Sequence, residues 1–126
     1  MSSVARMEVP NRMRSVNVRM LIDTMPIVST IDYIISESGV LPVAVWVKTK
    51  KSESTLDREL RSSGKAVSLL LQYGCSLKEV SETFTRDSII GSVVWYLNKN
   101  LDDILSTKQP EKAPNLSTQP TGYTIK

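Results

Sequence analysis

Three lysines that stand close together, Lys48, Lys50 and Lys51, are the residues of this chain with the clearest chemical use. If a helix begins directly after them, its free backbone N–H groups point outward at the same place, and helix N-termini favour anions. The segment therefore indicates a site for a phosphate or a nucleotide. A solvated basic loop is the alternative. Acidic residues that can neutralise the lysines follow at Glu53, Asp57 and Glu59.

Asp57 and Arg61 are separated by four positions, which places them on one face of a helix. A surface ion pair worth a few tenths of a kcal/mol explains this spacing without any function. A binding role for the pair comes from the family resemblance given below.

A second basic region lies at the start of the chain. The first twenty residues hold four arginines and one acid, Glu8, so that 4 − 1 gives a net charge of +3. The arginines are Arg6, Arg12, Arg14 and Arg19. Guanidinium groups suit phosphate and carboxylate oxygens. If they lie on an open sheet face beside Tyr33 or Trp46, a nucleotide or a single strand of nucleic acid can stack and pair there. In the alternative interpretation, Trp46 and Trp95 belong to the core or to a subunit interface.

The composition excludes several kinds of chemistry. The 126 residues include no histidine and one cysteine, and the net charge is only +3. Catalytic triads with histidine, histidine-bound zinc, an intrachain disulfide and cysteine-rich metal clusters are thereby excluded. We expect no metal and no cofactor. Cys75 is interpreted as a small apolar residue, and a binding module is favoured over an enzyme, for which only Lys, Ser and Asp chemistry would remain.

The first half of the chain shows the period of strands. Apolar and polar residues alternate over residues 15–22 and 27–35, and a short β-branched run occupies residues 43–47. Asp23-Thr24-Met25-Pro26 and Ser36-Glu37-Ser38-Gly39 separate these runs. Links of this length favour a three-stranded antiparallel meander.

After Lys51 the apolar spacing becomes helical. A helix of about twenty residues is predicted from Ser52 or Ser54 to Gly74. Ser76-Leu77-Lys78-Glu79 spells a capping box for a short second helix, and Asp87 or Ser88 is expected to cap a third. The apolar stripe of the third helix comprises Ile90, Val93, Val94, Leu97, Leu101 and Ile104. The predicted fold class is α+β, with three helices packed on one face of the meander.

The two ends of the sequence read differently from this domain. Residues 1–10 are expected to be a flexible lead-in, residues 11–105 the single α+β domain, and residues 106–126 a disordered tail rich in Pro, Ser and Thr. No signal-like apolar segment and no stretch near the roughly 18 apolar residues of a membrane span is found. We therefore expect a cytoplasmic protein without a membrane partner.

The stretch from Val45 to Leu77, VWVKTKKSESTLDRELRSSGKAVSLLLQYGCSL, resembles the TSCPD domain. That small module accompanies some cobalamin-dependent ribonucleotide reductases and also stands alone in bacteria and phages. In the family, a strand leads into a Lys-Ala-Gly-Ser turn, a helix with Asp and Arg one turn apart, and a segment like SLALQHGVPLE. The matching positions here are Lys51, Ser54, Asp57, Arg61, Ser68 to Gly74 and Leu77. Pro10-Asn11-Arg12 and Arg86-Asp87-Ser88 with Gly91 are similar to flanking segments of the stand-alone members.

The resemblance implies a compact, non-catalytic α+β module connected with nucleotide metabolism, and it covers about residues 10–104. Two departures matter. Ser52-Glu53 replaces the family's Ala-Gly, which adds a charge and a β-carbon and argues against a tight glycine turn around a phosphate. The cysteine-rich motif that gives the family its name is absent from the sequence, so a metal-binding knuckle is excluded.

These observations lead to three hypotheses of function. The first is a non-enzymatic binding or accessory protein that recognises a nucleotide-like anion or a protein partner, in nucleotide metabolism or in phage–host conflict. Its predicted ligand-binding residues are Arg12, Lys51, Ser54, Asp57, Arg61 and Arg86. The second is a nucleic-acid-binding accessory protein that uses the arginine-rich first strand and the lysine loop. The third is an assembly protein, dimeric or larger, acting through an exposed part of the third helix near Trp95 and Tyr96 and through the tail.

Overall fold

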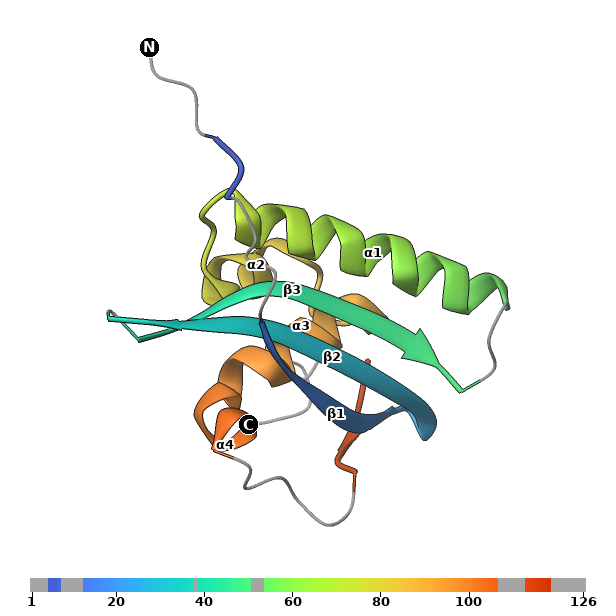
Figure 1. The fold of residues 1–126 in the computed structure, drawn as a ribbon. Helices are drawn as coiled ribbons and strands as arrows, with labels where there is room; N and C mark the ends of the chain where they lie inside the picture. The colour runs from blue at the N-terminus through green and yellow to red at the C-terminus, as the bar shows by residue number, and fades with distance from the viewer. Residues whose placement is uncertain (1–4, 8–12, 38, 51–53, 107–112, 119–126) are drawn as a thin grey trace.

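The chain forms a four-stranded sheet with helices packed on one of its faces, which confirms the α+β class (Figure 1). The computed structural model describes residues 5–7, 13–37, 39–50, 54–106 and 113–118. Figure 1 shows α2 and α3 on the far side of the strands and α1 alongside β3. None of the helices within these ranges has the length and hydropathy needed to cross a membrane.

The first three strands form the antiparallel meander that the alternating sequence predicts. They are β1 (Arg14–Ile22), β2 (Met25–Ser36) and β3 (Gly39–Thr49), with β2 between the other two. Alternate apolar residues of each strand are buried against the helices, whereas their neighbours face the opposite, open side. β3 extends past the expected 43–47 at both ends. A register shift beside Asp32 and Tyr33 accommodates Pro42, which cannot donate to a ladder.

The turn between β1 and β2 has an unusual backbone. Asp23 and Thr24 both have positive φ, 48° and 67°, as a two-residue hairpin of type I′ requires. A β-branched residue such as Thr24 rarely adopts this conformation. The turn is therefore a strained place that other contacts must hold.

The long helix α1 (Thr55–Gln72) begins and ends as its sequence predicts. The Ser54 hydroxyl accepts a hydrogen bond from the backbone N–H of Asp57 at 3.1 Å, which caps the first turn. At the other end Gly74 has φ 106°, and the N–H groups of Gly74 and Cys75 bond to the carbonyls of Leu71 and Leu70. This pair of bonds is a Schellman motif, which explains why the helix stops there.

Helix α1 runs along the outer edge of β3 and satisfies its backbone groups with side chains. The Ser68 hydroxyl accepts from the N–H of Val45 at 2.9 Å and donates to its carbonyl at 3.0 Å. Gln72 donates to the carbonyl of Val43 at 2.9 Å, and Asp57 accepts from the N–H of Thr49 at 2.9 Å. A free strand edge is a template for aggregation, and this row of bonds closes it.

The close approach of helix and strand depends on Gly64. A β-carbon at this position would lie 3.0 Å from the carbonyl oxygen of Val45. The buried positions that meet the edge of β3 are therefore small or polar, namely Asp57, Gly64, Ser68 and Gln72. Leu60, Val67 and Leu71, on the adjacent stripe, enter the core instead.

The remaining helices differ from expectation in one respect. α2 (Leu77–Thr83) has the predicted capping box, in which Ser76 and Glu79 bond to each other's backbone N–H groups. Ser88 caps α3 (Ile89–Lys99). The predicted third helix is wrong in its length, because Asn100 breaks it and residues Leu101–Leu105 form a separate helix, α4. At Asn100 the backbone leaves helical angles, with φ −115° and ψ 20°. The Tyr96 carbonyl accepts hydrogen bonds from both the backbone N–H and the side-chain amide of Asn100, each at 3.0 Å.

The expectation of a disordered tail is wrong for residues 113–118. Within them β4 (Asn115–Leu116) pairs in parallel with β1 and completes the sheet in the order β3-β2-β1-β4. The N–H of Leu21 donates to the carbonyl of Pro114 and that of Asp23 to Leu116, both at 2.7 Å. Without β4, these N–H groups on the outer edge of β1 would lack partners. A hydropathy pattern does not show such backbone groups.

Side chains secure the same segment to the strained hairpin turn. The N–H of Thr24 donates to Oδ1 of Asn115 at 3.0 Å, and the Thr118 hydroxyl donates to the Asp23 carboxylate. Part of the expected lead-in is also attached, because Arg6 and Met7 donate to Gln72 at the end of α1. Residues 1–4 and 8–10 of the expected lead-in and residues 107–112 and 119–126 of the expected tail lie outside the described residues.

We predict that Ser68→Ala lowers the free energy of unfolding by about 1–3 kcal/mol, because it leaves buried backbone groups of Val45 without partners. The measurement is urea denaturation followed by circular dichroism. Ser62→Ala is the matched control, since Ser62 is an exposed serine of the same helix and should change stability by less than about 0.5 kcal/mol. Equal stabilities of the two variants would contradict the role given to the edge bonds.

A second prediction concerns acid. The hydrogen bonds of Glu79 to the backbone and the hydroxyl of Ser76 lower the pKa of its carboxyl below the ordinary 4.5. The stabilisation by the carboxylate is therefore complete above that value and is lost as the pH falls through the lower folded pKa. Glu79→Gln should melt below the native protein at pH 6, and the two melting temperatures should converge toward pH 3. A gap independent of pH would show that the charge of Glu79 is irrelevant.

Candidate anion-binding site

The six residues predicted to bind a ligand do not form one cluster. Arg12 and Lys51 lie outside the described residues. The Ser54 hydroxyl caps the first turn of α1, and Arg86 lies near α3 and β4. Asp57 and Arg61 remain together on α1, where they form an ion pair of 2.9 Å.

The Asp57 carboxylate serves the fold and faces inward. Its side chain is fully buried, whereas that of Arg61 is 49% exposed. Oδ1 accepts from the backbone N–H and the hydroxyl of Thr49, and Oδ2 meets Arg61. The pair is therefore more than the surface ion pair considered from spacing, because it joins the end of β3 to the start of α1. Arg61 is held in place by a buried charge and presents its outer side to solvent.

Arg86 makes structural contacts with α3 and with the segment that follows β4. Its guanidinium lies 4.2 Å from the ring centre of Trp95, and Nη1 donates to the hydroxyl of Ser92 at 3.0 Å and to the carbonyl of Ser117 at 3.3 Å. Lys99 lies over the same indole at 4.7 Å. Cations thus cover Trp95, and the hypothesis of self-association through this part of α3 stays a prediction.

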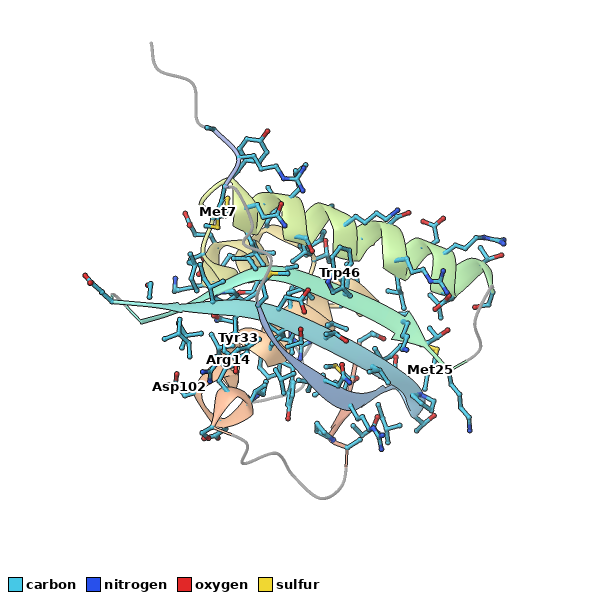
Figure 2. All side chains as sticks on the ribbon, viewed as in Figure 1. Met7, Arg14, Met25, Tyr33, Trp46 and Asp102 are labelled. Atoms are coloured by element: carbon cyan, nitrogen blue, oxygen red, sulfur yellow. The ribbon has the colours of Figure 1, made fainter. Side chains whose placement is uncertain are left out.

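A hollow of about 390 Å3 lies on the open side of the sheet, where α1 passes β3. It combines an indole, three small side chains and three cations. Its lining residues are Val28, Thr30, Trp46, Val47, Lys48, Arg61 and Lys65. Figure 2 labels Trp46 on β3 beside α1.

Strand register explains how these groups meet. Val28 pairs with Lys48 and Thr30 pairs with Trp46, so two adjacent rows of β2 and β3 form the floor. Arg61 and Lys65, one helical turn apart on α1, stand at its side. The hollow therefore exists because α1 is bound along the edge of β3.

The Trp46 side chain is fixed at one edge and partly open to solvent. Its Nε1 donates to Oδ2 of Asp32 at 2.8 Å, and Oδ1 of the same carboxylate accepts from the Ser15 hydroxyl at 2.6 Å. Asp32 lies opposite Ala44 of β3, which is 3% exposed. Trp46 itself is 42% exposed. A fixed, accessible indole is a surface on which a planar group can stack.

The charge of the hollow is positive. Asp57 balances Arg61, but neither Lys48 nor Lys65 forms an ion pair with a described residue. Lys50 lines a smaller hollow next to Ser54, beyond the end of β3. Arg19 lies two strands away in the same row as Lys48, about 10 Å across the sheet by the usual strand spacing. Phosphate or carboxylate groups are the ligands that such a surface suits.

Sequence reasoning found part of this site. Lys48, Trp46 and Arg61 were each singled out, but as members of different clusters. Lys65 was missed, although its position four residues after Arg61 places it on the same face of the helix. The arginine-rich start divides between the two sides of the sheet. Arg19 faces the open side, whereas Arg14 stands on the other side of β1, opposite Tyr33 (Figure 2).

No metal centre is evident in the parts of the chain that the structure describes, because no three His, Cys, Asp or Glu residues gather there. Comparison of the chain with family models gave no match, and comparisons with curated proteins and with solved structures gave none either. The resemblance to the TSCPD domain stays a prediction. The site consequently rests on its own geometry, an indole and basic side chains around a hollow on the open face of an α+β sheet.

We predict that the two basic residues of α1 in the hollow differ in their effect on stability. Arg61→Ala removes the charged partner of buried Asp57 and should cost about 1–2 kcal/mol of unfolding free energy. Lys65→Ala should change it by less than about 0.5 kcal/mol. Urea denaturation midpoints measure both. A loss as large for Lys65→Ala as for Arg61→Ala would mean that Lys65 also supports the fold.

Proposed function

We propose that the protein is a small, non-enzymatic binding protein that recognises a nucleotide-like anion in the hollow between β3 and α1. The observation that carries the proposal is the juxtaposition of the exposed indole of Trp46 with Lys48, Lys65 and Arg61. A nucleotide presents the same combination, a flat ring and a group of negative oxygens. Binding requires no chemical step from the protein.

The side chains divide the work of recognition. The base stacks against Trp46, whose orientation Asp32 fixes. Lys48 and Lys65 contact phosphate oxygens as mobile point charges, while Arg61 offers donors from a position set by Asp57. The uncharged floor formed by Val28 and Thr30 lets the ring approach the sheet. The free energy of binding thus comes from stacking together with charge-assisted hydrogen bonds.

The biological setting is the less direct part of the proposal. The resemblance of residues 45–77 to the TSCPD domain supports a role in nucleotide metabolism or in phage–host conflict. We place this role in the cytoplasm, where nucleotides are plentiful and a free thiol such as Cys75 stays reduced.

We expect CTP to bind the native protein. Lys65→Gln should lower the affinity for CTP about five- to tenfold, because one charge contact with phosphate is lost. Trp46→Ala should lower the affinity for CTP by roughly tenfold or more. It should change the affinity for pyrophosphate little, since only the nucleotide has a base that stacks. Isothermal titration calorimetry measures both ligands. Lys78→Gln, at an exposed position of α2, is the control with the same change of net charge. If Lys78→Gln lowers the affinity for CTP as much as Lys65→Gln does, CTP is attracted only by the net charge of the protein, and the proposed site is wrong.

Nucleic-acid binding is the second candidate, and the position of Arg19 favours it. Arg19, Val28 and Lys48 form one row across the open face, next to the row of Trp46, so a single strand lying over the sheet can contact Arg19 at one end of its row and Lys48 at the other.

This candidate predicts a steep dependence on salt. The logarithm of the affinity for a single-stranded oligonucleotide should fall by about 0.7 per phosphate contact for each unit of log salt. Arg19→Gln should reduce that slope by about 0.7. Fluorescence anisotropy at several salt concentrations measures it. A slope unchanged by Arg19→Gln would show that the nucleic-acid strand does not contact Arg19 and does not cross β1.

A further inference from the structure

An acidic side chain lies at one end of the otherwise basic open face. Asp32 is half-buried on β2, in the row next to Trp46 and Thr30. Among the described residues, its hydrogen-bond partners are the Ser15 hydroxyl and the Trp46 indole N–H, and neither carries a charge. A carboxylate in this position opposes the binding of any anion that covers it, so its presence restricts how a nucleotide can lie.

The hydrogen-bonding capacity of Asp32 is only partly used. Each carboxylate oxygen has two acceptor sites, and each accepts one bond, Oδ1 from Ser15 at 2.6 Å and Oδ2 from Trp46 at 2.8 Å. Both oxygens thus keep acceptor capacity beside the edge of the indole. An ionised carboxylate donates nothing, so the group that it selects must be a donor.

The open face is acidic on one side of Trp46, at Asp32, and basic on the other, at Lys48. Ala44, opposite Asp32, and Lys48 are four residues apart on β3, which is about 13 Å along the strand. Trp46 stands between them. A nucleotide stacked on this indole therefore lies with its phosphates toward Lys48 and Lys65 and with the far edge of its base toward Asp32. An extended nucleotide can span this length.

We propose that Asp32 selects nucleotides whose base carries an exocyclic amino group, such as cytosine, over those with a carbonyl group at the same place, such as uracil. This inference rests on the proposed function and adds the class of base to it. The amino group of cytosine donates to the free acceptor sites of Asp32, whereas the carbonyl of uracil brings an oxygen against a negative charge. Asp32 thereby has two roles: it holds the Trp46 indole in place, and it selects the base of the nucleotide.

The experiment compares CTP with UTP by isothermal titration calorimetry, on the native protein and on Asp32→Asn. The native protein should bind CTP about tenfold more tightly, as one well-made base contact allows. Asp32→Asn keeps an oxygen for the indole N–H but introduces an amide donor, so its preference should vanish or turn toward UTP. Asp102→Asn, on the exposed side of α4, is the control with the same change of charge and should keep the native preference.

The possible results separate the two proposals. Equal affinities of the native protein for CTP and UTP would overturn the selection by Asp32 while leaving the nucleotide site in place. A preference for CTP that persists in Asp32→Asn would also overturn it, because the carboxylate would then only position Trp46. Failure of both nucleotides to bind the native protein would overturn the proposed function and this inference together.

Discussion

The hydrogen bonds between α1 and the outer edge of β3 are the interaction on which the rest of the structure depends. Ser68, Gln72 and Asp57 take the place of a neighbouring strand, and Gly64 lets the helix come close enough for them to do so. The sheet can therefore end at β3 without an exposed ladder. The same contact sets Arg61 and Lys65 above the open face, so the fold and the candidate site share one cause.

Local structure was largely readable in the sequence because its causes are local. The alternation of apolar residues predicted the three antiparallel strands, and Ser54, Ser76, Ser88 and Gly74 marked helix ends through bonds within a few residues. The break at Asn100 was not readable, because the apolar stripe continues through it to Ile104. The backbone of Asn100 departs from helical angles there, and the hydropathy pattern does not change with it.

The features that depend on distant partners were harder to foresee. The spacing of Asp57 and Arg61 fits an ordinary surface pair, and only the position of β3 buries the acid. Trp46 and Lys65 are far apart in the sequence and meet because helix and strand run side by side. Residues 113–118 have the composition of a tail, yet the free edge of β1 gives their backbone partners that composition does not reveal.

The docking of β4 on β1 also sets an order of events in folding. The bond between Thr24 and Asn115 joins residues 91 positions apart, whereas the β1–β2 turn closes over two residues. Long loops cost more entropy to close, so the hairpin forms early and its last neighbour arrives late. During synthesis, β1 and β2 are made long before residues 113–118. Until then, Leu21 and Asp23 stay open to other chains, and the final strand ends this period of exposure.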